Sequence, residues 1–309
     1  MFFSFFIKSF LIISFAAVST YGSGGSSSVE SLYEKTLKPY YESIKEHKEF
    51  AKKRKTAYII SAILAVIVFA IFAKYFKGPG VVVALVMCVA GYLYLKGLNS
   101  PVGVYEKLYK SNIISPISYE RGGYKFKDSK FTQYDVDQTN IFRPTIELFE
   151  SEDIYEKDGV RVGWIDIEFN TKENASVERF AENVFTGFLI EIDVKTNSNG
   201  VLISQKLKDV VADMDVEMAS FFAKGKRGSM YHGFELYDFV DDKDINRVKK
   251  FANKEIAFSF RNSRSKVYIA LYKKINPLNI HIFSNFDIDK ARGYADFFKE
   301  IDELVHVFR

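Results

Sequence analysis

Residues Thr56–Ala73, TAYIISAILAVIVFAIFA, and Val81–Leu95, VVVALVMCVAGYLYL, are two apolar runs separated by KYFKGPG, Lys74–Gly80. Neither run contains a charged residue. With their aromatic flanks, each approaches the roughly 20 residues that a helix needs to cross about 30 Å of hydrocarbon. The Gly-Pro-Gly turn would end one helix and start the next, so the sequence predicts a two-helix transmembrane hairpin over residues 56–98. The alternative is a pair of buried core helices, but helices of soluble proteins keep a polar stripe that these runs lack.

The composition limits what the rest of the chain can be. The chain has 309 residues and a formal net charge of +4. Roughly two hundred residues follow the second apolar run, which is enough for a hydrophobic core. The basic residues and aromatics do not interleave in the stripe typical of nucleic-acid binders, so we expect no nucleic-acid partner. Cys88 is the only cysteine, which excludes a disulfide within the chain and a thiolate metal cluster.

A third apolar stretch, MFFSFFIKSFLIISFAAVST, occupies residues 1–20, and a Gly/Ser-rich linker follows as far as Ser28. Residues 1–28 have three interpretations, which the sequence leaves open. They form a secretory signal peptide, an extra apolar helix, or an extension that results from a mis-assigned start codon.

A basic amphipathic helix is predicted over residues 29–55, where apolar residues recur at spacings of three and four. Five basic residues lie within eight positions directly before the first apolar run: Lys48, Lys52, Lys53, Arg54 and Lys55. Basic residues next to membrane spans remain on the cytoplasmic side. We therefore expect a multi-pass protein of the bacterial inner membrane with the bulk of the chain in the cytoplasm. A cleaved signal peptide would invert this topology.

Residues 99–309 are predicted to form one α+β domain with a mostly antiparallel sheet. Several segments alternate apolar and polar residues as half-buried strands do. The predicted strands are Val160–Phe169, Phe185–Val194, Val201–Ser204, Gly233–Val240, Glu255–Phe260, Lys266–Tyr272 and Ile280–Phe283. We expect a helix over Asp241–Asn253 and a closing amphipathic helix over Asp287–Phe308, with Asp287 as its N-cap.

No motif in the sequence indicates catalysis, a cofactor or a metal site. His232 lies in a loop-like context and is the weak candidate for a catalytic residue. Acidic clusters at Asp135/Asp137, Asp213/Asp215/Glu217 and Asp241/Asp242/Asp244 lack the spacing of a calcium loop. The segments Gly225–Ser229 and Ser263–Lys266 only partly match a phosphate-binding loop and a Ser-x-x-Lys nucleophile, and we interpret both as turns. The sequon at Asn174–Ser176 carries little weight in a cytoplasmic segment.

Two stretches resemble a known family. They are Phe149–Ile154 with Gly163–Phe169, and Val184–Asp193. Together with the basic helix and the hairpin, they are similar to bacterial domain-of-unknown-function family 3137, some members of which carry the label "galanin". The resemblance covers Val29 to Arg309 and implies a bacterial inner-membrane protein with no catalytic residues to carry over. It also suggests a LemA-type membrane protein as a partner.

These observations favour a non-enzymatic binding or scaffold module that presents its α+β domain to a protein partner or to the lipid headgroups. An exposed sheet edge would permit strand addition. The alternative is an enzyme acting on an envelope or membrane substrate, with a site near His232. A transporter is disfavoured, because two helices without an intramembrane charge provide no ion path. The sequence gives neither the ligand nor the oligomeric state.

Overall fold

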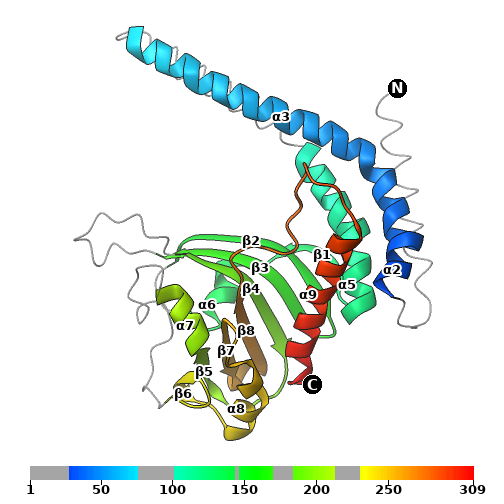
Figure 1. Ribbon diagram of the computed structural model, residues 1–309. Helices are drawn as coiled ribbons and strands as arrows, with labels where there is room; N and C mark the ends of the chain where they lie inside the picture. Colours follow the sequence, from blue (N-terminus) through cyan, green and yellow to red (C-terminus); the bar gives the residue numbers. More distant parts are fainter. Residues whose placement is uncertain (1–27, 76–100, 143–145, 170–183, 213–229) are drawn as a thin grey trace. The chain divides into compact units, whose positions relative to one another are not determined.

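The computed structural model (Figure 1) describes residues 28–75, 101–142, 146–169, 184–212 and 230–309. The chain divides into two compact units. The helical unit consists of the described residues before Arg121 together with Ile280–Gly293. The sheet unit consists of the described residues of Arg121–Asn279 together with Tyr294–Arg309.

The helical unit begins with a continuous helical run of α2 (Val29–Leu32), the π-helical turn η1 (Tyr33–Leu37) and α3 (Lys38–Tyr75). The Ser28 hydroxyl caps the first turn by accepting a hydrogen bond from the Ser31 N–H at 3.2 Å. Residues 101–109 are also helical and lead through η2 (Lys110–Ile114) into α5 (Ser115–Gly122). Apolar side chains at helical spacing, among them Leu37, Ile44 and Ile113, are buried and form the core of this unit.

Among the residues that the structure describes, no helix combines the length and the apolar character needed to cross a membrane. This finding contradicts the predicted two-helix transmembrane hairpin over residues 56–98. It also contradicts the predicted multi-pass location in the inner membrane with a cytoplasmic bulk. The first apolar run does not start a helix of its own, but continues the 38-residue helix α3, whose first half carries many charged side chains. The second run, with Cys88, and residues 1–27 lie outside the described residues.

One eight-stranded sheet forms the sheet unit, with the spatial order β1-β2-β3-β4-β8-β7-β5-β6. All neighbouring strands are antiparallel. The strands are β1 (Lys125–Lys130), β2 (Ile146–Lys157), β3 (Val160–Phe169), β4 (Val184–Asp193), β5 (Asn199–Ser204), β6 (Phe234–Phe239), β7 (Ile256–Arg261) and β8 (Lys266–Tyr272). The first four strands form a meander, and the β7–β8 hairpin lies between β4 and β5, in the middle of the sheet.

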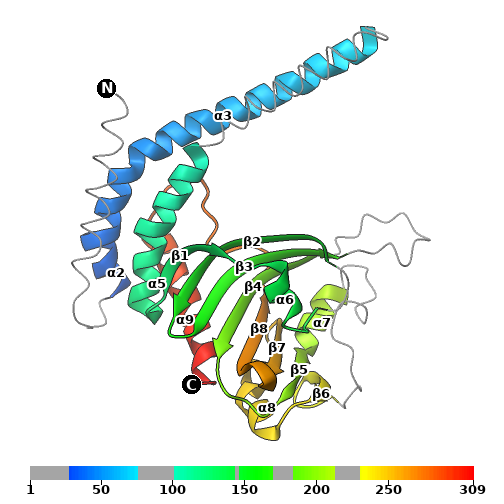
Figure 2. The same cartoon turned by 180° about the vertical axis from the view of Figure 1, so that it is seen from behind.

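Helices cover both faces of this sheet (Figures 1 and 2). On one face lies the part of α9 (Ile288–His306) that starts at Tyr294. There the rings of Phe297 and Phe188 lie 4.4 Å apart between centroids, and those of Phe298 and Tyr155 lie 5.1 Å apart. On the other face, α6 (Gln133–Asp137) and α7 (Gln205–Ala212) contribute Val136 and Leu207 to a second apolar cluster. Because both faces are covered, central strands such as β8 are apolar on both sides.

The structure shows the α+β architecture, the antiparallel sheet and the closing helix that the sequence predicts, whereas the transmembrane part of the predicted fold is contradicted. The Asp287 carboxylate accepts a hydrogen bond from the Lys290 N–H at 3.0 Å, which confirms the predicted N-cap of α9. The helix predicted from Asp241 is present as α8 (Asp242–Val248) and a 3-10 turn that ends at Phe251. The prediction of a strand at Ile280–Phe283 is wrong. This segment contains a turn, and Ile282 is buried in the helical unit.

Candidate functional site

A pocket of about 390 Å³ lies in the sheet unit next to the turn that joins β2 and β3. Asp158 and Gly159 form this turn, with φ angles of 41° and 76°. Asp-Gly suits a two-residue hairpin turn, because both central residues must adopt the left-handed region that these residue types tolerate. The turn therefore holds the ends of β2 and β3 in a fixed position beside the end of β4, where Asp193 completes the wall.

Charged side chains from four strands and the turn line the pocket. The basic lining residues are Lys125, Lys127, Lys157 and Arg161, and the acidic ones are Glu156, Asp158 and Asp193. The strand register explains how they meet. Lys125 pairs across the sheet with Glu156, and Glu156 pairs with Arg161 on β3. Residues directly opposite each other project to the same face, so the pairing places opposite charges side by side.

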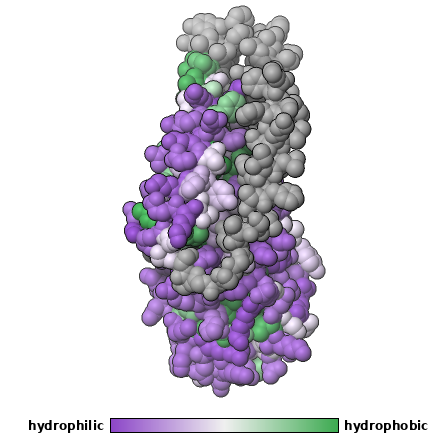
Figure 3. Space-filling view, turned by 90° about the vertical axis from the view of Figure 1, so that its right-hand side faces the viewer, coloured by the Kyte–Doolittle hydropathy of each residue, from purple (hydrophilic) through white to green (hydrophobic). Residues whose placement is uncertain are grey.

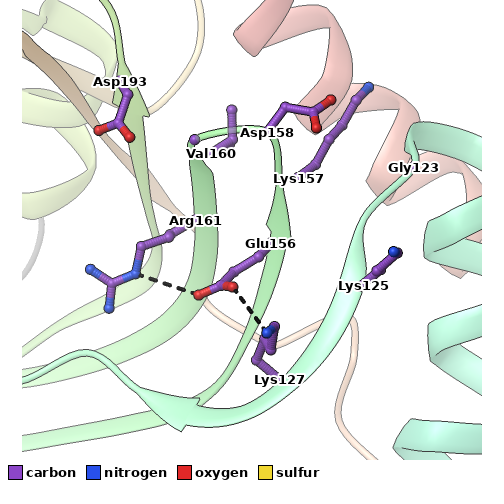
Figure 4. Close-up of a pocket in the computed structure, with 10 residues that line it drawn as sticks. Gly123, Lys125, Lys127, Glu156, Lys157, Asp158, Val160, Arg161 and Asp193 are labelled. Carbon is purple, nitrogen blue, oxygen red and sulfur yellow. Dashed lines mark ion pairs between the residues drawn. The ribbon is translucent and has the colours of Figure 1, made fainter.

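Glu156 lies between two cations in the pocket (Figure 4). Its carboxylate oxygens are 3.7 Å from Lys127 Nζ and 4.0 Å from Arg161 Nε. Both distances exceed the 2.7–2.9 Å that is usual for a charge-assisted hydrogen bond. In contrast, the side chain of Lys157 points away from this group, and its Nζ lies 3.3 Å from Asp302 on α9. Lys127 and Arg161 are therefore the cations that share the central carboxylate.

A more deeply buried network continues from Arg161. Its Nη1 lies 3.4 Å from Glu191 and 3.7 Å from Asp135, and its guanidinium lies over the Phe131 ring at 4.7 Å from the centroid. Glu191, whose side chain is only 7% exposed, is also 2.5 Å from Lys266 Nζ. Burial lowers the pKa of Lys266, but hydrogen bonds to Glu191 and Asp193 outweigh burial and raise the pKa above its ordinary value of 10.5. Lys266 therefore stays positively charged and fixes the base of the network.

The five basic residues predicted as a membrane flank lie on α3, in the helical unit and not in the pocket. Lys48 is 3% exposed and donates hydrogen bonds to Tyr41 Oη and to Asn285 Oδ1, both at 2.8 Å. It thus holds the 280–293 segment against α3 within that unit. Lys52 and Lys53 are on the same helix, Arg54 lies over the ring of Phe50, and Lys55 lies over that of Tyr58.

His232 lies in a tight turn that precedes β6. The turn is closed by two backbone hydrogen bonds between Tyr231 and Phe234, at 2.9 and 3.0 Å. His232 has a φ of 50°, is exposed and contacts the Tyr231 ring edge-on at 4.6 Å. It does not line the pocket. Its assignment as a weak catalytic candidate stays a prediction.

The acidic clusters have different positions. Asp135 forms a capping box with Thr132, and its carboxylate lies 3.7 Å from Arg161 Nη1 without lining the pocket itself. Asp241 caps α8, and the buried Asp244 accepts hydrogen bonds from Thr196 and Ser198 at 2.7 and 2.6 Å. Within the described part of the chain, no group of three or more His, Cys, Asp or Glu residues could hold a metal ion. The cluster at 213–217, the segment Gly225–Ser229 and the sequon at 174–176 lie outside the described residues.

The sequence alone does not predict the pocket, although part of the signal is local. The stretch Glu156–Arg161, EKDGVR, places an Asp-Gly turn between two charged strand ends. Lys125, Lys127 and Asp193 carry no such signal, because only the register of β1 and β4 brings them to the turn.

Comparisons with known proteins identify no relative: no family model, no curated protein and no solved structure matches this chain. The resemblance to family 3137 and the LemA-type partner that it suggests therefore stay predictions.

Proposed function

We propose that this chain is a non-enzymatic binding module, and that its sheet unit binds an anionic group, a phosphate or a carboxylate, in the pocket beside the β2–β3 turn. One observation carries the proposal. The Glu156 carboxylate already lies between Lys127 and Arg161, at 3.7 and 4.0 Å. An internal carboxylate thus marks a position suited to an anion. The two contacts are long, and the Glu156 side chain is 36% exposed, so it can turn into water when a ligand anion takes its place.

The charges of the pocket favour binding over proton transfer. A general base or a nucleophilic lysine needs a pKa near the working pH. Lys266, at the base of the network, has its pKa raised instead. The guanidinium of Arg161 supplies donors in a planar fork that matches carboxylate and phosphate oxygens. On the face in Figure 3, hydrophilic side chains predominate among the described residues.

Calorimetric titration of the full chain with inorganic phosphate and with succinate at low ionic strength tests this function. We expect saturable binding that weakens as salt is added, because salt screens exposed charges. Lys127→Ala should weaken binding by about fivefold to tenfold, which corresponds to roughly 1 kcal/mol.

A second variant gives an effect of opposite sign. Glu156→Gln removes the internal competitor and should tighten anion binding severalfold. Lys243→Ala, which removes an exposed lysine of α8 outside the pocket, is the matched control and should leave affinity unchanged. The proposal fails if neither anion binds, if Glu156→Gln weakens binding, or if the control variant weakens binding as much as Lys127→Ala does.

A further inference from the structure

Strand β1 lies at one edge of the described sheet and has β2 as its only neighbour there. Its residues are exposed apart from Phe126, which is half-buried. An edge strand presents backbone N–H and C=O groups to which another extended segment can pair. The register of β1 shifts between Lys127 and Lys130, so the regular part of this edge is short. A segment that pairs with it therefore needs additional attraction from side chains.

The charge of β1 determines which segment fits. The strand KFKDSK contains Lys125, Lys127 and Lys130 against a single Asp128, a net charge of +2. Lysines on an edge strand discourage pairing with other copies of the same chain, because like charges directly opposite each other repel. The same lysines attract a strand that carries carboxylates at alternate positions. The edge is thus selective for an acidic segment and disfavours a second copy of β1.

The opposite edge of the sheet does not offer such a template. Strand β6 begins with Phe234 and Glu235, which are both buried. Near its end, Asp238 has a φ of 60°, which interrupts the extended backbone that regular pairing needs. Among the described strands, β1 is therefore the edge better suited to accept a partner.

The pocket continues from this edge, since Lys125 and Lys127 of β1 also line it. We infer that β1 accepts an acidic, extended segment of a partner protein as an additional strand, with a side-chain carboxylate of that segment in the pocket. This inference rests on the proposed function, because the pocket supplies the anion contact. Backbone pairing provides attachment, and alternate carboxylates opposite Lys125 and Lys127 provide specificity.

Fluorescence anisotropy with labelled hexapeptides and the full chain tests the inference. The probe alternates glutamate and valine, and a peptide that alternates lysine and valine is the charge control. Two further acidic peptides carry N-methyl groups on alternate backbone nitrogens. One peptide is methylated on the odd-numbered residues and the other on the even-numbered residues. Only one register of N–H groups can face β1, so we expect one methylated peptide to lose about tenfold or more in affinity while the other binds like the parent.

Hydrogen–deuterium exchange provides a second readout. The acidic peptide should slow exchange of β1 amides, and Lys127→Ala should weaken the peptide and inorganic phosphate alike, while Lys243→Ala changes neither. If both methylated peptides bind as well as the parent, or if the β1 amides stay unprotected, strand addition is refuted, while phosphate binding would still support the pocket. If phosphate does not bind either, the proposed function fails as well.

Discussion

The two edges of the sheet differ in how they are joined to the rest of the sheet unit. At the β6 edge, Phe234 is fully buried and its ring lies 6.0 Å from that of Phe258, while the buried Glu235 forms an ion pair with Lys208 of α7. At the β1 edge, the only aromatic side chain is the half-buried Phe126, whose ring lies 5.8 Å from that of Tyr155. The start of β6 is part of the core, whereas β1 is a charged surface along its length. We therefore expect stability to depend mainly on one edge and binding on the other.

The largest loss of stability should follow from Phe234→Ala. This change removes a fully buried ring and leaves a cavity beside Phe258, so it should lower the free energy of unfolding by about 3–5 kcal/mol. Urea unfolding followed by the fluorescence of Trp164 is the measurement. Trp164 is the only tryptophan of the chain and is buried in the sheet unit, so its signal reports on that unit. A loss below about 1 kcal/mol would contradict the assignment of the β6 edge to the core.

Gly200→Ala should have the next largest effect. A Cβ atom at Gly200 would lie 2.5 Å from the Tyr237 carbonyl oxygen and 2.8 Å from that of Phe239. Both oxygens belong to the backbone of β6, which has to move to relieve the overlap. We expect a loss of about 2–3 kcal/mol in the same unfolding experiment. A substitution that left stability unchanged would show that β6 can separate from β5 at little cost, which contradicts its role as an integral edge.

Phe126→Ala tests the opposite edge with the same type of truncation. Because Phe126 is only half-buried, the change should cost about 1–1.5 kcal/mol. The difference between the losses of unfolding free energy in Phe126→Ala and Phe234→Ala matters more than either value, since both variants remove a phenyl ring from an edge strand. Equal losses would mean that the two edges contribute equally to the core.

The fourth effect in size concerns pH and the attachment of α9. Glu300 lies 2.5 Å from Lys254, which precedes β7, and 3.0 Å from Lys273, which follows β8. Burial raises the pKa of Glu300, but these hydrogen bonds outweigh burial and leave the pKa below its ordinary value of 4.5. The stabilisation is therefore fully present above about pH 4.5 and is lost as the pH falls through the lower pKa of the folded state.

Glu300→Gln should lower the free energy of unfolding by about 1 kcal/mol at pH 7. The difference in unfolding free energy between the variant and the native chain should disappear in acid. Urea unfolding at pH 7 and at pH 3 measures both. Asp166 provides a contrast, since burial raises its pKa despite the hydrogen bond from Trp164 Nε1 at 2.8 Å. Its contribution to stability has the opposite sign: it is present at low pH and is lost as the pH rises through the raised pKa. A gap for Glu300→Gln that is independent of pH would contradict the role given to the two lysines.

Much of the sheet unit could be predicted from the sequence, because alternation is a local signal. Residues Val160–Phe169 and Lys266–Tyr272 are the strands that their patterns indicate. Strand β1 was missed because KFKDSK carries too little apolar alternation, as expected of an exposed edge strand. The Ile280–Phe283 prediction failed for the opposite reason: its alternation reflects Ile282 entering the core of the helical unit, where no strand partner is present among the described residues.

The candidate site could not be predicted in the same way. Arg161, Glu191 and Lys266 are far apart in the sequence and meet only because β3, β4 and β8 are neighbours. Nothing local distinguishes Lys48 from the other basic residues before Thr56, yet it is buried against Tyr41 and Asn285. A cluster of basic residues in the sequence reliably predicts a local positive charge. It does not predict that Lys48 is buried, because that depends on a segment more than two hundred residues further along the chain.

Lys127→Ala should have the smallest effect on stability and the largest on ligand binding. The Lys127 side chain is 55% exposed, and its ion pair with Glu156 spans 3.7 Å. Exposed pairs of this kind contribute little, so the free energy of unfolding should change by less than about 0.5 kcal/mol. Phe234→Ala should show the reverse, a large loss of stability without a loss of affinity. In buffer without urea, the folded fraction of this variant should still bind phosphate with native affinity. If instead Lys127→Ala destabilises the sheet unit by more than about 1 kcal/mol, the Lys127 side chain stabilises the fold together with the ion pairs around Arg161. The separation of a stabilising edge from a binding edge would then be wrong.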